Sequence, residues 1–328
     1  MKITVLGTGG WGTALSQVLC DNGHTVTLWS HNPEKAEQLT WTRENPLLPG
    51  VKLPEALTFT GSMDQLGQQD LVVFATPSYA VRTTAAKAAP FLRPGTPLVS
   101  VSKGVERDTH DLMSQIIEEE VQKSCRVIAL SGPSHAEEVG RRIPTGVVAA
   151  HPDEAAARLV QDAFMNEYFR VYTSHDIIGV ELAAALKNVV ALSCGVIDGM
   201  GYGDNTKALL MTRAMAEMGR LGEKLGGRRE TFAGLAGMGD LIVTCTSMHS
   251  RNRRCGILIG QGKSAQEAME EIGAVVEGYY AADSVRQLAE QTGVEMPICR
   301  CAYEVLYENK STQSVVRELM TRARKQED

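Results

Sequence analysis

Short apolar runs alternate with amphipathic segments through the first half of the chain. The runs that predict buried strands lie at 2–6, 25–30, 71–77, 97–104, 126–134, 145–150 and 169–174. Between them, apolar residues at helical spacing predict helices at 11–23, 33–43, 108–123 and 153–164. Strands that alternate with helices are typical of an α/β fold with a doubly wound, mostly parallel sheet.

The pattern changes after about residue 174. Segment 177–200 predicts one long, mostly apolar helix, and segment 207–226 predicts another. Further helical segments continue to the end of the chain without strand-like runs. A chain of 328 residues is long enough for two ordinary domains. We therefore expect an N-terminal α/β domain over 1–173 and an all-helical C-terminal domain over 174–328.

A glycine-rich loop follows the first predicted strand. Residues 7–12, Gly-Thr-Gly-Gly-Trp-Gly, fit the G-x-G-x-x-G pattern of a dinucleotide-binding Rossmann-type domain and open the first helix. Gly7 would permit the tight turn, Gly9 the approach of the pyrophosphate, and Gly12 close packing of helix on strand. The amide groups at the helix N-terminus would bind the phosphates. The alternative is a glycine turn without a ligand.

The end of the second strand bears on the choice of nicotinamide cofactor. NAD enzymes of this fold place Asp or Glu there to hold the ribose hydroxyls. Here the candidates are Ser30, His31 and Asn32, none of which repels a 2′-phosphate, and His31 is able to donate to one. We therefore expect the domain to accept NADP as well as NAD.

Polar residues follow three predicted strands, where ligands bind in a doubly wound sheet. Thr76 follows the first of these strands, Lys103 the second, and Gly132 and Ser134 the third. We expect Ser134 to cap a short helix. Each segment has a simpler interpretation as a connector, and Lys103 as a solvated loop lysine. Three such ends in one sheet favour a binding site.

Lys187 lies in the apolar helix predicted at 177–200. Its helical neighbours three and four residues away are all alanine or valine, so this is not a solvated face. Burial would lower the pKa of such a lysine from about 10.4 towards neutrality, where proton exchange is useful. Asn188 would share the same pocket. The alternative is a structural lysine paired with an acid such as Glu181 or Asp240.

Two later segments carry further polar candidates. A flexible glycine loop over 234–245 would present Asp240, with Thr244 on the same helical face. The segment HSRNRRCG (249–256) places Ser250, Arg251 and Asn252 at a predicted helix start. An arginine beside free helix amides is a common phosphate site. The alternative is a solvated patch formed by the three arginines of this segment.

Composition excludes some classes and leaves others open. A net charge of −6 and a pI near 5.7 weigh weakly against a nucleic-acid partner. We expect no apolar run to reach the roughly 18 residues of a membrane span. The seven cysteines are odd in number and lack metal-binding spacing, so they predict free thiols in a reducing compartment and no metal site.

The chain as a whole resembles the bacterial-type NAD(P)-dependent glycerol-3-phosphate dehydrogenases. The resemblance rests on motifs that occur in order along nearly its full length. They are GTGGWGTALS, VSKGVE, SGPSHAEEV, AALKNVVAL, GLAGMGDLIVTCTS, HSRNRRCG and VVEGY. It implies a cytoplasmic enzyme, a homodimer that uses NADP or NAD and feeds phospholipid synthesis.

The resemblance also implies roles for single residues. It makes Lys187 the general acid/base in hydride transfer to the C2 carbonyl of dihydroxyacetone phosphate, giving glycerol 3-phosphate. The substrate positions that it implies are Lys103, Gly132, Ser134, Lys187, Asn188, Asp240, Thr244, Ser250, Arg251 and Asn252. The cofactor positions are Gly7, Gly9, Gly10, Trp11, Gly12, His31, Lys103, Ala136, Arg251, Val275 and Glu277. For Glu277, a favourable contact with a helix dipole is the simpler alternative.

Two other functions remain open from the sequence. A 6-phosphogluconate or related hydroxyacid dehydrogenase also joins such a sheet to a helical domain and uses a lysine. A sensor of NADP(H) would keep the first domain but would not need a lysine in an apolar pocket beside a phosphate site.

Overall fold

The computed structural model describes residues 1–122, 125–324 and 326–327. The chain forms two compact units, Met1–Glu181 and Leu182–Asp328. The division lies within one long helix, α7 (Ile177–Gly199), whereas the sequence predicts a domain boundary near residue 173, ahead of that helix. The helix is therefore continuous from one unit into the other.

The first unit is built on one sheet, which has eight strands in the described residues. These are β1 (Lys2–Leu6), β2 (Thr25–Trp29), β3 (Thr58–Thr60), β4 (Leu71–Phe74), β5 (Leu98–Ser100), β6 (Val127–Ser131), β7 (Thr145–Ala150) and β8 (Phe169–Ser174). Their order is β3-β2-β1-β4-β5-β6-β7-β8, and only β6 and β7 pair antiparallel. The predicted doubly wound, mostly parallel sheet is confirmed.

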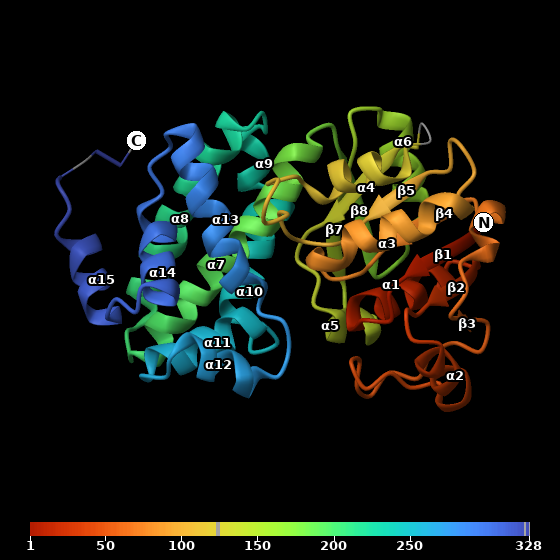
Figure 1. Cartoon of the computed structure of the whole chain (residues 1–328), viewed down its shortest axis with the longest axis horizontal. Helices are drawn as coiled ribbons and strands as arrows, with labels where there is room; N and C mark the ends of the chain where they lie inside the picture. The colour runs from red at the N-terminus through yellow and green to blue at the C-terminus, as the bar shows by residue number, and fades with distance from the viewer. Residues whose placement is uncertain (123–124, 325, 328) are drawn as a thin grey trace. The chain divides into compact units, whose positions relative to one another are not determined.

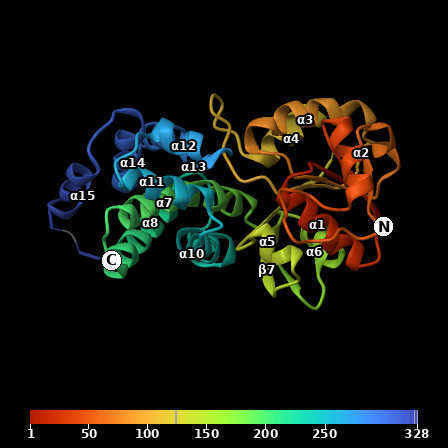
Figure 2. The same ribbon diagram turned by 90° about the horizontal axis from the view of Figure 1, so that it is seen from below.

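Helices cover both faces of this sheet, as Figure 2 shows. They are α1 (Gly10–Asp21), α2 (Pro33–Thr42), α3 (Val81–Ala88), α4 (Met113–Val121), α5 (Ala136–Gly140) and α6 (Glu154–Phe164), with 3₁₀ turns at Asp64–Gln68, Ser78–Ala80 and Ala89–Phe91. Leu15 of α1 and Val160 of α6 belong to the apolar core on one face. Val81 of α3 and Ile117 of α4 belong to the core on the other.

Two elements of the first unit were not predicted from the sequence. Strand β3 has three residues, too few for an alternating pattern, and pairs with β2 at the edge of the sheet. Helix α3 has the sequence VRTTAAKA, whose small and polar residues give little helical signal. The helix predicted at 108–123 is shorter, Met113–Val121, and its predicted end at residue 123 lies outside the described residues.

The second unit is helical throughout its described part, as predicted (Figure 1). After α7 come α8 (Asp204–Lys224), α9 (Arg229–Ala233), α10 (Asp240–Thr246), α11 (Arg251–Gly260), α12 (Ala265–Ile272), α13 (Glu277–Thr292), α14 (Pro297–Tyr307) and α15 (Thr312–Met320). A π-helical turn, Leu235–Gly239, leads directly into α10.

Helix α7 corrects one sequence prediction. By length and composition it is apolar enough to cross a membrane, although no such run was expected. Most of its apolar window, 83%, is buried inside the structure. Burial on nearly all sides is the property of a core helix, which needs apolar residues around its whole circumference.

Candidate active site

The glycines of the first loop differ in how much room a side chain would have. Gly7 has a φ of +131°, and a Cβ there would lie 2.7 Å from the Ala75 carbonyl oxygen. A Cβ on Gly12 would lie 2.2 Å from the carbonyl oxygen of Gly7, so a side chain would push α1 away from the loop. A Cβ on Gly9 would meet nothing within 4 Å, so the backbone there faces open space.

The start of α1 fits the pyrophosphate of a dinucleotide. Gly9 is the N-cap and its backbone is extended, so no side chain occupies the first amide groups. Free amides, a positive helix end and the open space over Gly9 are what an anion needs. The carbonyl oxygen of Leu47 packs against Gly10, where a Cβ would lie only 2.5 Å from that oxygen. Trp11 packs on Phe169 with ring centroids 6.4 Å apart.

The three candidate residues at the end of β2 do not all face a ligand in the way that the sequence suggests. Ser30 is fully buried, and its hydroxyl accepts from the backbone N–H of Asn32. The Asn32 side chain is the N-cap of α2 and accepts from the backbone N–H of Glu34. His31 and Asn32 are both exposed, but the Asn32 side-chain oxygen is already used in the helix cap. The oxygens of the Ser30 and Asn32 side chains therefore bind backbone amides, whereas the exposed His31 ring is not used by the helix cap.

The ends of β5 and β6 are brought together. Lys103 donates from Nζ to the Gly132 carbonyl oxygen at 3.0 Å and to Ser134 Oγ at 3.2 Å. Lys103 is half-buried, so the simpler interpretation as a solvated lysine is wrong. Ser134 does not cap α5 as predicted, because its hydroxyl donates to Gly132 and the N-cap is His135. Ala136 begins that helix.

In the second unit, Lys187 is buried in an ion pair. Its Nζ lies 2.6 Å from Asp240 Oδ1 and 2.7 Å from Thr244 Oγ1, and the Lys187 side chain is 7% exposed. Of the two acids proposed as partners, the pair forms with Asp240. Glu181 instead accepts from the backbone N–H and hydroxyl of Ser114 within the first unit. A carboxylate stabilises the ammonium form that burial disfavours.

Asp240 is held more rigidly than predicted. The glycine-rich segment before it is a π-helical turn and not a flexible loop. A Cβ on Gly237 would lie 2.1 Å from the Phe232 carbonyl oxygen, so the turn requires glycine there. Asp240 is the first residue of α10, and Thr244 one turn later donates to its carbonyl oxygen at 2.6 Å. This turn fixes the carboxylate beside Lys187.

The predicted helix start at 251 is confirmed. Ser250 is the N-cap of α11 and accepts from the backbone N–H of Arg253 at 3.2 Å. Arg253 pairs with Asp198 at 2.7 Å, so it is a structural arginine and not part of a solvated patch. Arg251 is exposed, and the described residues offer it no ion pair. Arg251, the first residue of the helix, is thus available to an anion at this helix start, as is the exposed Arg254 in the same turn.

Two asparagines link three helices of the second unit. Asn252 Nδ2 donates to Asn188 Oδ1 at 3.0 Å, and the Gly278 backbone N–H donates to Asn252 Oδ1 at 2.8 Å. Gly278 is the second residue of α13, so the start of that helix, with Val275 and Glu277, is tied to α7 and α11. These bonds place Asn188 and Asn252 on one buried network.

Helices α7 and α11 cross at unusually close range. Gly195 and Gly199 of α7 face Gly256 and Gly260 of α11, with ideal Cβ positions 3.0 Å from the facing glycine Cα atoms. A Cβ on Gly256 would lie 2.0 Å from the Leu192 carbonyl oxygen. Contact between two glycine faces leaves no freedom to slide. The crossing therefore fixes the helix of Lys187 against the helix of Arg251.

Two residues that contact the glycine loop are not predicted from the sequence. Asn45 donates from Nδ2 to the carbonyl oxygen of Thr8 at 3.0 Å and to Thr13 Oγ1 at 2.7 Å. Lys35 donates from Nζ to the same carbonyl oxygen at 3.2 Å. Asn45 lies in an irregular loop that gives no signal. Lys35 lies in the first turn of the helix that follows β2, and this position could have been inferred from the sequence.

Comparison with known proteins decides the family. The model of the "NAD-dependent glycerol-3-phosphate dehydrogenase N-terminus" matches residues 2–157, and that of the corresponding C-terminus matches residues 176–317. The chain belongs to the NAD-dependent glycerol-3-phosphate dehydrogenase family. The expected family, enzyme class and nicotinamide cofactor are thereby confirmed, against the hydroxyacid dehydrogenase and the sensor.

Individual members of the glycerol-3-phosphate dehydrogenase family match over nearly their full length. A glycerol-3-phosphate dehydrogenase [NAD(P)+] of Moorella thermoacetica is 52% identical over 99% of this chain and 97% of its own. One of Geobacillus thermodenitrificans is 50% identical over 99% and 96%. The crystal structure of glycerol-3-phosphate dehydrogenase from Coxiella burnetii is 35% identical, with a TM-score of 0.93 over 98% and 99%.

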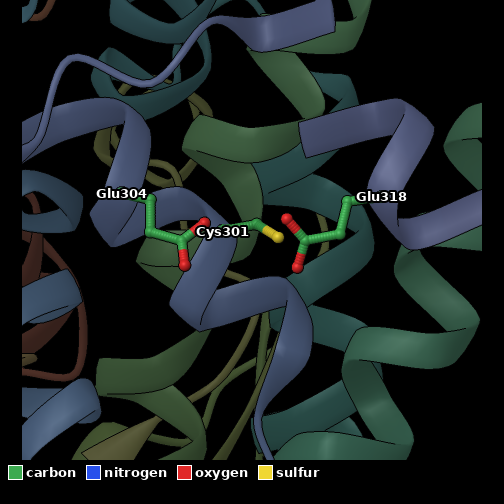
Figure 3. Close-up of side chains that lie close together, drawn as sticks. All are labelled: Cys301, Glu304 and Glu318. Atoms are coloured by element: carbon green, nitrogen blue, oxygen red, sulfur yellow. The ribbon is translucent and has the colours of Figure 1, made fainter. Parts of the chain in front are cut away.

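A cluster of possible metal ligands lies elsewhere in the second unit. Figure 3 shows Cys301, Glu304 and Glu318, whose ligand atoms lie within 4.8 Å of one another. Both carboxylates already pair with Arg300 and Lys310. Burial raises the pKa of the Cys301 thiol to about 11, whereas a metal needs the thiolate. The cluster is therefore best described as an ion-pair network between α14 and α15.

Proposed function

We propose that this chain interconverts dihydroxyacetone phosphate and sn-glycerol 3-phosphate, with Lys187 as general acid/base. The observation that carries the proposal is the buried Lys187 beside Asp240 and Thr244, on a helix fixed against the start of α11. A lysine in apolar surroundings that nevertheless keeps a carboxylate and a hydroxyl is suited to hold and release a proton.

The cofactor would be held by the first unit. The loop residues Gly7, Gly9 and Gly12 fit a dinucleotide, as their steric surroundings indicate. When bound, NAD(P)H supplies the hydride for reduction of a carbonyl. The remaining cofactor positions that we propose are Gly10, Trp11, His31, Lys103, Ala136, Arg251, Val275 and Glu277.

A proton from Lys187 would neutralise the charge that hydride addition leaves on the substrate oxygen. Reduction of the C2 carbonyl adds a hydride to carbon and leaves negative charge on oxygen. Lys187 donates a proton from Nζ to that oxygen, and in the reverse direction it removes the proton of the C2 hydroxyl. Asp240 accepts from the ammonium at 2.6 Å and so orients it. Asn188 would donate to the same substrate through its side-chain N–H, since its Oδ1 already accepts from Asn252.

The substrate phosphate would bind at the start of α11. Arg251 is exposed there and carries the guanidinium that binds phosphate in a bidentate manner. The N-terminal amides of α11 add positive charge. Ser250 and Asn252 shape this end of the helix. In the first unit, Lys103, Gly132 and Ser134 form the polar cluster that would hold the same substrate.

We also propose where the enzyme acts and what its product is used for. The enzyme would act as a cytoplasmic homodimer that supplies glycerol 3-phosphate for phospholipid synthesis. A reducing compartment is supported by seven free cysteines, since no disulfide joins any of them in the described residues. A net charge of −6 supports a small-molecule partner over a nucleic acid.

The test is NADPH consumption at 340 nm with dihydroxyacetone phosphate, run beside a panel of phosphorylated keto and hydroxy acids. We expect oxidation with the triose phosphate and little with the panel. Preference for a hydroxyacid would contradict the substrate assignment. Binding of NADPH without turnover of any substrate would contradict the proposed reaction. Kinetics with both cofactors would then give the preference ratio.

A further inference from the structure

The end of β2 carries a cation that the sequence motif did not include. Lys35 is the third residue of α2, and its Nζ donates to the Thr8 carbonyl oxygen at 3.2 Å. Thr8 lies between Gly7 and Gly9 in the glycine loop. The ammonium group thus lies against the glycine loop, at a residue whose hydroxyl donates to Ser30 at the end of β2. In this fold, the 2′ position of the adenosine ribose is read at that point.

The polar side chains next to Lys35 already form hydrogen bonds with backbone groups. Ser30 is fully buried and accepts from Asn32, whose own side chain caps α2. Asn45 shares the Thr8 carbonyl oxygen with Lys35. These contacts hold Lys35 against the loop but leave two of its three ammonium donors unused by any hydrogen bond within the described residues.

The acids of this region do not neutralise the cation. Glu34 and Glu37 are on α2, and in the described part of the chain neither forms an ion pair with Lys35. The position where an NAD enzyme carries Asp or Glu is occupied by the buried Ser30 and the exposed His31. Lys35 is therefore a cation that no described ion pair neutralises, in contact with the glycine loop through the Thr8 carbonyl oxygen.

We propose that Lys35, together with the exposed His31 at the end of β2, forms the subsite for the 2′-phosphate of NADP(H) and sets a preference for NADPH over NADH. The proposal rests on the proposed function and names the residue that selects its cofactor. Burial lowers the pKa of Lys35, and a phosphate dianion beside it favours the charged form again. The bound phosphate would accept hydrogen bonds from an ammonium group that burial has partly removed from water.

Binding of cofactor fragments tests the subsite without turnover. The probes are adenosine 2′,5′-bisphosphate and adenosine 5′-monophosphate, which differ only in the 2′-phosphate, measured by calorimetry on wild type, Lys35→Gln and Lys35→Arg. We expect Lys35→Gln to weaken the bisphosphate by about 10-fold or more, as loss of a charge-assisted bond does, and the monophosphate by less than about 2-fold. Lys35→Arg should retain most of the bisphosphate affinity.

A matched control separates local from general charge effects. Lys87→Gln removes the same charge from the exposed end of α3 and should leave both affinities unchanged. Added salt should weaken the bisphosphate more steeply in wild type than in Lys35→Gln. The same selective loss should appear in the dissociation constants of NADPH against NADH.

Two results would overturn the proposal. An equal loss of both fragments would show that Lys35 only supports the glycine loop through Thr8. Unchanged binding of both would show that the 2′-phosphate lies elsewhere. Neither result depends on dihydroxyacetone phosphate, so failure of the proposed reaction would be recognised separately, by bound NADPH that is not consumed.

Discussion

The environment of Lys187 combines two opposing effects. Its helical neighbours are apolar and buried, which disfavours the ammonium form, whereas Asp240 at 2.6 Å favours it. Thr244 accepts a further hydrogen bond from the ammonium. An amine held in this balance is able to exchange a proton without leaving its position. The sequence identified the lysine, but two acids were equally acceptable partners until the chain was folded.

We expect Lys187→Ala to lower kcat by about 10²- to 10⁴-fold, the usual contribution of general acid/base catalysis. NADPH affinity should stay within about 2-fold, because Lys187 is not among the loop residues that fit the dinucleotide. The measurements are kcat at 340 nm and NADPH binding by fluorescence. Lys224→Ala, at the exposed end of α8, is the control. Near-normal turnover of Lys187→Ala would remove the lysine from its proposed role.

At the scale of elements, the glycine faces of α7 and α11 position the site. Gly195 and Gly199 meet Gly256 and Gly260 without room for a side chain. The asparagine pair Asn188–Asn252 lies on the same two helices. Close packing and a buried hydrogen bond together determine how Lys187 and Arg251 are spaced within the second unit. The sequence shows glycines at four-residue spacing but not which helices they join.

We expect Gly256→Ala to destabilise the second unit by about 1–3 kcal/mol, as overpacking does, because its Cβ would meet the Leu192 carbonyl oxygen at 2.0 Å. Thermal unfolding is the measurement. Gly219→Ala is the matched control, since a Cβ there would meet only Arg229, at 3.8 Å. That variant should gain about 0.5–1 kcal/mol from helix propensity. Equal stability of the two variants would contradict the role of the crossing.

At the scale of the whole molecule, two buried glutamates join elements distant in sequence. Glu217 of α8 accepts from the backbone N–H of Ile298, near the start of α14. Glu181 of α7 accepts from Ser114, near the start of α4. Burial raises the pKa of each carboxyl from its usual 4.5 to about 7, although these hydrogen bonds act in the opposite direction. Both therefore connect stability with pH.

The sign follows from the raised pKa of Glu217. Below pH 4.5 the carboxyl is protonated in both states and costs nothing. Between pH 4.5 and about 7 the unfolded chain loses this proton while the folded chain keeps it, so stability falls as pH rises. Above about pH 7 the loss is complete, at a magnitude on the order of 3 kcal/mol.

Glu217→Gln should therefore gain stability over wild type as pH rises from 5 to 8. Glutamine keeps an oxygen for the Ile298 amide but carries no charge to desolvate. The measurement is the midpoint of thermal unfolding at each pH, and the exposed Glu308→Gln is the control, with no such trend. A difference between Glu217→Gln and wild type that stays constant with pH would contradict this account.

The sequence by itself determined the two-part α/β and helical organisation, the glycine loop and the helix of Lys187. These depend on local periodicity and on backbone conformations that only glycine adopts, so they are readable from neighbouring residues. The tertiary structure decided that Asp240 is the partner of Lys187, that Gly256 meets α7, and that Lys35 reaches Thr8. Each of these contacts joins residues distant along the chain or depends on how a long side chain is placed, and no local pattern encodes that.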